Sequence, residues 1–224
     1  MKVGVLALQG DVREHSGMLA RCGARAVIVK KTSQLTGLDG LIIPGGESTT
    51  MGKLVERYGF ADAIRAEHAR GMAIYGTCAG LILIARETVE ATGQPLLGLM
   101  DIVARRNAFG RQVASFEAAL DAPALGAEPV VGVFIRAPWI ELAGDDVEVL
   151  ANHDGHIVMA RQGRLLATAF HPELTEDERV HRFFLEEVIG AHGKREACPD
   201  TQNGLRSSTR KAPSTQSAAS SSRV

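Results

Sequence analysis

Cysteine is scarce in the 224-residue chain, which contains only Cys22, Cys78 and Cys198, far apart in the sequence. An odd number of cysteines without Cys-x-x-Cys spacing argues against a disulfide framework and against a zinc site. Free thiols are typical of a reducing compartment, so we expect a cytoplasmic protein. We expect no metal and no cofactor.

The chain also lacks an excess of one charge and a long apolar run. Its 25 basic side chains are balanced by 26 acidic ones, which leaves no basic surface for nucleic acid. No apolar run is long enough to span a bilayer, and Met1–Val5 leads into an apolar segment instead of a secretory signal. We therefore expect neither a nucleic-acid partner nor a membrane.

Apolar side chains are sufficient for one globular domain, because 45% of the residues are hydrophobic. The composition changes after His192, where Ser, Thr, Ala, Gln and charged residues dominate. Such a segment cannot bury enough surface to offset its ordering entropy. The sequence predicts a domain over residues 1–192 and a disordered polar tail over residues 193–224.

The first part of the chain alternates between strand-like and helix-like segments. Apolar runs predict strands at residues 3–8, 26–29 and 40–43 and another directly before Cys78. Helices are expected at about 11–22 with Asp11 as the cap, at 49–57, at 60–69 and after Cys78. This alternation predicts an α/β fold with a parallel sheet covered on both faces.

Shorter apolar runs follow and predict antiparallel strands, some of which extend the sheet. These runs lie at residues 113–120, 130–135, 147–150, 157–160 and 165–170. A last amphipathic helix is expected at about 176–189. The segment His153–His156 contains Asp-Gly, which is more typical of a hairpin turn than of a metal site.

A nucleophile elbow is indicated by Gly-Thr-Cys-Ala-Gly at residues 76–80, between an apolar strand and an apolar helix. Glycines on both sides of Cys78 leave room for a sharp turn with strained backbone and an exposed thiol. The helix that follows directs its positive end at the sulfur, which favours the thiolate. The alternative is a buried cysteine in an ordinary strand-to-helix turn.

A base and its orienting acid are indicated by His171-Pro172-Glu173, directly after an apolar strand. Residues two apart in an extended chain project to the same side, so Glu173 can hold the imidazole of His171. His171 would then accept the proton of the Cys78 thiol. The alternative is a simple turn that opens the last helix.

A glycine-rich loop, Pro44–Ser48, ends another predicted parallel strand. Ligands bind at this edge of such sheets, where backbone N–H groups can reach them. The N–H groups of Gly46 and Ala79 are candidates for an oxyanion hole. The alternative, a turn with Ser48 or Thr49 capping the next helix, is compatible with it.

Together, the elbow and the His-x-Glu pair resemble class I glutamine amidotransferases. Further motifs in the same order resemble the glutaminase subunits of pyridoxal 5′-phosphate synthases: Leu6–Asp11, Pro44–Thr50, Arg106–Gln112, Phe134–Pro138 and Phe170–Leu174. The likeness covers about residues 1–189 and excludes the tail. It implies a three-layer, flavodoxin-like fold with a largely parallel central sheet.

The resemblance also implies an activity: hydrolysis of L-glutamine to glutamate and ammonia, which passes to a synthase subunit in a large hetero-oligomer. It implies a catalytic triad of Cys78, His171 and Glu173. The positions that it assigns to glutamine binding are Gly46, Glu47, Ser48, Arg106, Ile135 and Arg136. A guanidinium of Arg106 or Arg136 would bind the α-carboxylate, whereas Arg105 and Arg111 are expected to be surface charges.

Glutaminases of this kind are expected to be nearly inactive until the synthase docks, and we interpret Gln9-Gly10 as a candidate sensor of that partner. Three alternatives remain. The first is a glutaminase for another synthase, although the motifs Leu6–Asp11 and Arg106–Gln112 weigh against it. The second is a cysteine hydrolase or stress protein of the same fold, which usually lacks a His-x-Glu pair. The third is an inactive binding subunit.

Overall fold

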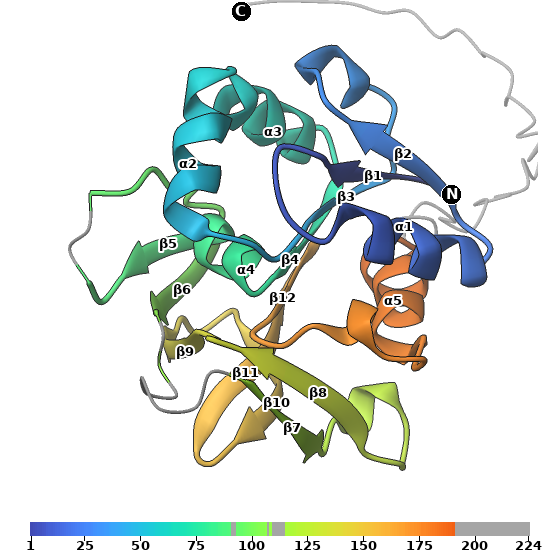
Figure 1. The fold of residues 1–224 in the computed structure, drawn as a ribbon, viewed down its shortest axis with the longest axis vertical. Helices are drawn as coiled ribbons and strands as arrows, with labels where there is room; N and C mark the ends of the chain where they lie inside the picture. The colour runs from blue at the N-terminus through green and yellow to red at the C-terminus, as the bar shows by residue number, and fades with distance from the viewer. Residues whose placement is uncertain (91–92, 107, 109–114, 191–224) are drawn as a thin grey trace, which may run out of the picture.

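The computed structural model describes residues 1–90, 93–106, 108 and 115–190 (Figure 1). The strands are β1 (Lys2–Leu6), β2 (Arg25–Val29), β3 (Gly40–Ile43), β4 (Ala73–Thr77), β5 (Ala85–Thr88), β6 (Met100–Arg105), β7 (Ser115–Leu120), β8 (Val130–Ile135), β9 (Trp139–Ala143), β10 (Glu148–His153), β11 (His156–Gln162) and β12 (Leu165–Thr168). The α-helices are α1 (Val12–Arg21), α2 (Ser48–Arg57), α3 (Phe60–Ala69), α4 (Ala79–Ile84) and α5 (Arg179–Phe183). Short 3-10 turns are η1 (Thr32–Gln34), η2 (Pro123–Leu125) and η3 (Pro172–Leu174), and a π-helical turn is η4 (Phe184–Ile189).

The central sheet has ten strands, nine of them in the order β2-β1-β3-β4-β12-β11-β9-β6-β5, with β10 paired to β11. From β2 to β12 every pairing is parallel, as the alternation of strands and helices predicts. The carboxyl ends of β1, β3, β4 and β12 therefore meet at one edge of the sheet. The predicted α/β fold is confirmed.

Beyond β12 the sheet is mixed: β11 and β9 run antiparallel to their neighbours, and β5 and β6 are parallel to each other. Strands β5, β6 and β9 did not follow from the apolar runs. β5 continues directly from the apolar helix α4, and the exposed Glu141 interrupts the apolar residues of β9. The predicted hairpin at His153–His156 is confirmed, with Asp154 at a positive φ of 49° between β10 and β11.

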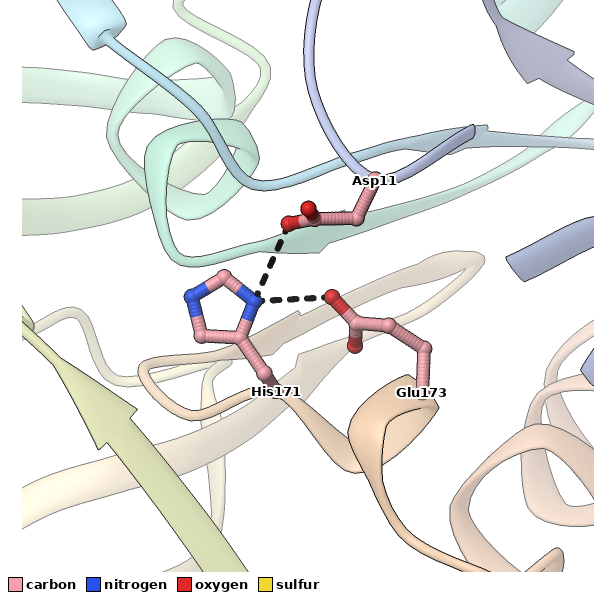
Figure 2. Close-up of side chains that lie close together, drawn as sticks. All are labelled: Asp11, His171 and Glu173. Atoms are coloured by element: carbon pink, nitrogen blue, oxygen red, sulfur yellow. Dashed lines mark hydrogen bonds and ion pairs between the residues drawn. The ribbon is translucent and has the colours of Figure 1, made fainter. Parts of the chain in front are cut away.

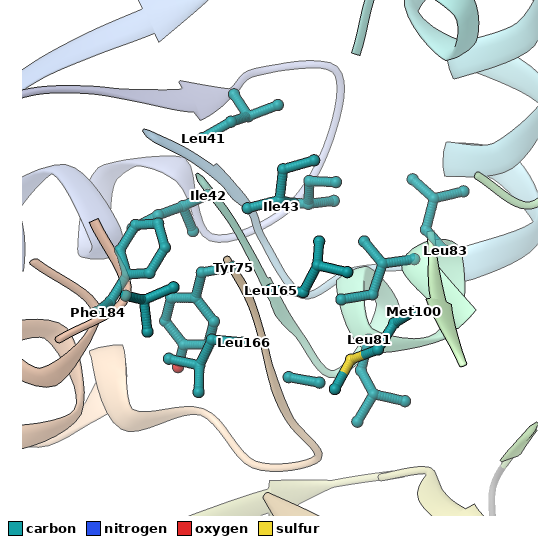
Figure 3. Packing of buried hydrophobic residues seen from close by; sticks show 14 of the residues in the cluster. Leu41, Ile42, Ile43, Tyr75, Leu81, Leu83, Met100, Leu165, Leu166 and Phe184 are labelled. Carbon is teal, nitrogen blue, oxygen red and sulfur yellow. The ribbon is translucent and has the colours of Figure 1, made fainter. Parts of the chain in front are cut away.

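Helices cover both faces of the parallel half, with α1 and α5 on one side and α2, α3 and α4 on the other (Figure 1). Side chains alternate accordingly, and Ile42 and Tyr75 lie toward Phe184, on the side of α1 and α5 (Figure 3). Leu41 and Ile43, from the same strand as Ile42, lie on the opposite side (Figure 3). All five side chains are fully buried, which explains why these strands are apolar without a period of two.

The end of the domain differs from the single helix predicted at 176–189. The carboxylate of Asp177 accepts a hydrogen bond from the Arg179 N–H at 2.9 Å, so α5 begins only at Arg179. The chain then widens into the π-helical turn η4, whose Phe184 and Val188 are fully buried. Within the described part of the chain, no helix is both long enough and apolar enough to cross a membrane. The predicted tail lies outside the described residues.

Candidate active site

Cys78 lies at the turn between β4 and α4 and has φ 49° and ψ −100°. A positive φ is strained for a residue with a side chain, as the elbow motif predicts. The flanking glycines are required by close packing: a Cβ on Gly76 would lie 2.5 Å from the Gly80 carbonyl, and one on Gly80 would lie 2.1 Å from the Ile43 oxygen. The prediction of an exposed thiol is wrong, because Cys78 is only 7% exposed and borders a pocket instead of open solvent.

His171 and Glu173 lie together as their spacing predicts. His171 Nδ1 is 2.8 Å from Glu173 Oε1, and both side chains are buried (Figure 2). Pro172 and Glu173 form the turn η3, and the His171 N–H donates to the carbonyl of Val133 in β8 at 2.8 Å. These backbone contacts fix the position of the His171 imidazole in the site.

Asp11 provides a second carboxylate, with Oδ2 3.4 Å from His171 Nδ1 (Figure 2). Asp11 occupies the N-cap position of α1, but its side chain makes no capping hydrogen bond. The prediction of a helix-capping side chain is therefore wrong, and the carboxylate turns toward the imidazole. A polar residue after β1, at the same sheet edge as Cys78, was the available signal for this role.

The electrostatics of the site favour a charged imidazole. Burial alone would lower the pKa of His171, but interactions with Asp11, Cys78 and Glu173 outweigh burial and raise the pKa to about 12. Burial would likewise raise the pKa of Glu173, yet His15 and His171 hold that pKa well below its usual range. Nδ1 faces the two carboxylates (Figure 2), so Nε2 is the ring nitrogen that is left to interact with the sulfur.

A cavity of about 370 Å³ opens in front of the sulfur. It is lined by the following residues: Gln9, Asp11, Gly46, Glu47, Ser48, Cys78, Ala79, Ile82, Arg106, Ile135, Arg136, Pro138 and His171. Every residue predicted for catalysis or glutamine binding is on its wall, except Glu173, which is buried behind His171. Arg111 lies outside the described residues, and Arg105 pairs with Glu141 at 2.8 Å, away from the cavity.

One wall carries charge of both signs. Glu47 caps α2 by accepting hydrogen bonds from the Thr49 and Thr50 N–H groups, at 3.0 and 2.7 Å. Hydrogen bonding by the Thr50 side chain, together with these N–H groups, lowers the pKa of Glu47 to about 2. Capping thus falls to Glu47, and the interpretation of Ser48 or Thr49 as the cap is wrong. Arg106 Nη2 lies 3.6 Å from Glu47 Oε1 and 3.2 Å from Thr49 Oγ1, which directs the guanidinium toward the cavity.

The end of β8 forms another part of the wall. The Ile135 carbonyl oxygen is 4.0 Å from the Cys78 sulfur. Arg136 has a positive φ of 44°, which bends the chain out of β8 directly beside the pocket. Both residues border the cavity, as the resemblance implies, and the strained backbone of Arg136 adds a feature that motif comparison did not indicate.

Two glycine-bearing loops contact each other beside the sulfur. A Cβ on Gly10, which has φ 95°, would lie 1.7 Å from the Gly45 carbonyl oxygen. In the amide orientation that satisfies both partners, Gln9 accepts from the Glu47 N–H at 3.0 Å and donates to the Glu47 carbonyl at 3.2 Å. The loop after β1 therefore holds the loop that carries Gly46.

Asp11, His171 and Glu173 also place three potential metal-ligand atoms within 4.8 Å of one another. The Nδ1 atom of His171 is already engaged by both carboxylates, as in an acid–base site. The expectation that no metal is used remains a prediction.

The comparison with protein families matches residues 5–190 to the SNO glutamine amidotransferase family. The chain belongs to this family. A protein of Pelotomaculum thermopropionicum named pyridoxal 5′-phosphate synthase subunit PdxT is 59% identical over 191 residues, which cover 85% of this chain and 97% of the relative. The protein of the same name from Streptomyces coelicolor is 56% identical, over 83% of this chain and 93% of the relative.

A solved structure supports the same assignment. A crystal structure of a glutamine amidotransferase superposes with a TM-score of 0.79 at 52% identity, covering 84% of this chain and 98% of the other. The structure of PurLQS from Thermotoga maritima contains a chain that superposes with a TM-score of 0.59 at 18% identity, over 83% of this chain and 97% of the other. This second likeness shows the shared fold alone. The family resemblance predicted from the motifs is confirmed.

Proposed function

We propose that the protein is a glutaminase that hydrolyses L-glutamine to L-glutamate and ammonia at Cys78. The observation that carries this proposal is the Cys78 sulfur at a pocket that also exposes His171, whose Nδ1 is held by Glu173 at 2.8 Å. Membership of a glutamine amidotransferase family supports glutamine as the amide. The guanidinium of Arg106, between Glu47 and Thr49, supports recognition of an α-carboxylate.

In the first half of the proposed reaction, the Cys78 thiolate attacks the side-chain carbonyl carbon and forms a carbon–sulfur bond. The carbonyl electrons move to oxygen, and the N–H groups of Gly46 and Ala79 stabilise the oxyanion. When the tetrahedral intermediate collapses, its carbon–nitrogen bond breaks. His171 transfers the Nε2 proton to the leaving nitrogen, which departs as ammonia.

In the second half, water attacks the γ-glutamyl thioester while His171 accepts a proton from it. The carbon–sulfur bond breaks, so the thiolate and the imidazolium are restored. One glutamine and one water thus give one glutamic acid and one ammonia. Glu173 holds His171 in the tautomer that this proton transfer needs.

We further propose that the ammonia passes to a synthase subunit that makes pyridoxal 5′-phosphate, within a large cytoplasmic hetero-oligomer. The support is the printed name of the relatives, which describes each as a subunit of a pyridoxal 5′-phosphate synthase. The free thiols of Cys22 and Cys78 agree with a reducing compartment.

The experiment is ammonia release from L-glutamine, with and without the synthase subunit, for the parent and for Cys78→Ala. The proposal predicts release that the partner stimulates and that Cys78→Ala abolishes. Strong release without a partner would instead indicate a glutaminase for another pathway. No release with a demonstrably bound synthase would indicate a binding subunit.

Gln9 is our candidate for the element that senses the partner, because its carboxamide holds the backbone of Glu47 next to Gly46. A change in the loop after β1 would therefore alter the oxyanion hole. We expect Gln9→Ala to weaken the stimulation of ammonia release by the synthase. Stimulation equal to that of the parent would contradict this role.

A further inference from the structure

The acid of the triad contacts a second buried imidazole, on the side away from the pocket. Glu173 Oε1, which accepts from His171, also lies 3.3 Å from His15 Nε2, and the His15 and Glu173 side chains are both fully buried. His15 comes from α1, near the opposite end of the domain in sequence. The proposed reaction does not use it.

His15 also contacts two other elements of the fold, β4 and α5. Its Nε2 is 3.1 Å from the hydroxyl oxygen of Thr77, the residue before the nucleophile. Its Nδ1 is 3.0 Å from Nε2 of His181 in α5, which lies beside α1 (Figure 1). The ring of Tyr75 packs edge-on against it at 6.3 Å. Among the described residues, the titratable side chains that contact His15 are Glu173, His181 and Tyr75.

The direction of these hydrogen bonds follows from His181. Burial and the neighbouring His15 lower the pKa of His181 to about 3, so its ring is neutral and carries one proton. His181 Nδ1 has no hydrogen-bond partner among the described residues. A proton there would be a buried donor without an acceptor, so the proton belongs on Nε2 and is donated to His15 Nδ1. His15 then has its own proton on Nε2, the atom that lies 3.1 Å from Thr77 Oγ1 and 3.3 Å from Glu173 Oε1.

The carboxylate needs this contact because its other oxygen has none. Glu173 Oε2 is buried and makes no hydrogen bond to any residue that the structure describes. Its two partners, His15 and His171, therefore share Oε1. Without His15, the catalytic imidazole would be the only described side chain in polar contact with the carboxylate that orients it.

We propose that His15 is a positioning residue that donates from Nε2 to Glu173 and thereby fixes the carboxylate that orients His171. The inference rests on the proposed glutaminase function and extends the triad by one buried donor. His181 sets the tautomer of His15 from the other side. His15 touches neither glutamine nor the sulfur and does not line the pocket.

The test compares His15→Leu, which removes the donor, with His15→Gln and His15→Asn. A glutamine amide can replace the donor at Nε2, whereas the shorter asparagine amide corresponds to Nδ1. We expect His15→Leu and His15→Asn to lower kcat for synthase-stimulated ammonia release by about 10- to 100-fold, as for the loss of one hydrogen bond to a charged group. We expect His15→Gln to recover most of the rate and KM for glutamine to stay unchanged in all three.

A second measurement does not depend on glutamine. The rate of Cys78 alkylation is followed against pH in the intact protein, by mass spectrometry of the labelled peptide. We expect the midpoint to move to higher pH in His15→Leu, because a poorly held Glu173 stabilises the imidazolium beside the thiolate less well. If the midpoint shifts in His15→Leu but the parent releases no ammonia, the proposed function is wrong and the positioning role of His15 still holds.

Two controls separate positioning from simple destabilisation. Met18→Ala removes a buried side chain from the same helix outside this network and is expected to leave the pH midpoint and kcat unchanged. In the double variant with Glu173→Gln, His15→Leu is expected to cause little additional loss of kcat, since it acts through Glu173. Three results would each overturn the proposal. The first is an equal loss of kcat in His15→Leu and His15→Gln, and the second is an unchanged pH profile of Cys78 alkylation in His15→Leu. The third is an additive loss of kcat in the double variant.

Discussion

At the scale of single residues, the site depends on side chains whose charge is set by their neighbours. His171 would be neutral if burial alone acted on it, but Asp11, Cys78 and Glu173 reverse that effect and raise its pKa to about 12. A charged imidazole beside the sulfur supplies the proton that ammonia needs on leaving. The neighbouring side chains thus decide whether His171 is charged, because a buried charge without partners would be unstable.

Arg106 provides a residue-scale prediction about substrate binding. Its guanidinium lies beside Glu47 and Thr49 on the pocket wall, where an α-carboxylate can accept two hydrogen bonds. We expect Arg106→Gln to raise KM for glutamine by about 10- to 100-fold with a much smaller change in kcat. Steady-state ammonia release at varied glutamine concentration measures both parameters.

Arg105→Gln is the matched control, because the neighbouring arginine pairs with Glu141 outside the pocket. We expect its KM to equal that of the parent. If Arg106→Gln has the same KM as the parent, Arg136, the other arginine on the described pocket wall, would be the residue that binds the α-carboxylate.

At the scale of elements, the elbow exists because a helix packs directly on the strand beside it. Gly80, in the first turn of α4, approaches the backbone of β3 so closely that a Cβ would lie 2.1 Å from the Ile43 oxygen. Gly76, in β4, meets Gly80 in the same way. These contacts, together with the positive φ of Cys78, hold the sulfur at the pocket.

Gly80→Ala is therefore expected to be destabilising by at least about 1–3 kcal/mol, the usual cost of forcing extra atoms into a packed region. Gly17→Ala is the matched control, because Gly17 lies inside α1 and a Cβ there would meet nothing within 4 Å. We expect Gly17→Ala to be stabilising by about 0.5–1 kcal/mol through helix propensity. Urea unfolding of both variants measures the change, and similar values for both would contradict the packing explanation.

At the scale of the whole molecule, buried histidines make stability depend on pH. The pKa of His181 is about 3 in the folded protein, against an ordinary value of 6.5. Below pH 6.5 the His181 side chain therefore binds a proton in the unfolded chain but not in the folded chain. The free energy of unfolding decreases as the pH is lowered from 6.5 to about 3. Folding excludes this proton because His181 is completely buried.

We expect His181→Leu to reduce this acid sensitivity. The free energy of unfolding of the parent should fall more steeply between pH 6.5 and 3 than that of His181→Leu, because only the parent carries this titration. Urea unfolding at several pH values measures both slopes. Parallel curves would show that His181 is protonated inside the folded protein.

The domain boundary provides a second whole-molecule prediction. The family match ends at residue 190, and we expect a chain ended after His192 to keep the thermal midpoint and the ammonia release of the full chain. A chain ended after Phe183 is the control, because it loses the buried Phe184 and Val188 of η4 and should unfold. A lower midpoint for the chain ended after His192 would place residues 193–224 within the folded unit.

The sequence by itself determined the features that arise within a few residues. The strand, turn and helix around Cys78, and the proximity of His171 and Glu173, follow from short-range geometry, because glycines and a two-residue spacing restrict the backbone locally. The parallel half of the sheet followed from its fully apolar strands in the same way. The family motifs added the residues of the pocket wall.

Only the tertiary structure decided which distant residues meet. The Asp11 carboxylate lies beside His171 instead of capping α1, and His15 lies beside Glu173. These contacts and the order of β5, β6 and β9 join segments far apart in the chain. Local propensity contains no information about such contacts, since packing of the whole core selects them. The sequence therefore predicted the triad motif, but it did not predict the buried polar contacts behind the triad.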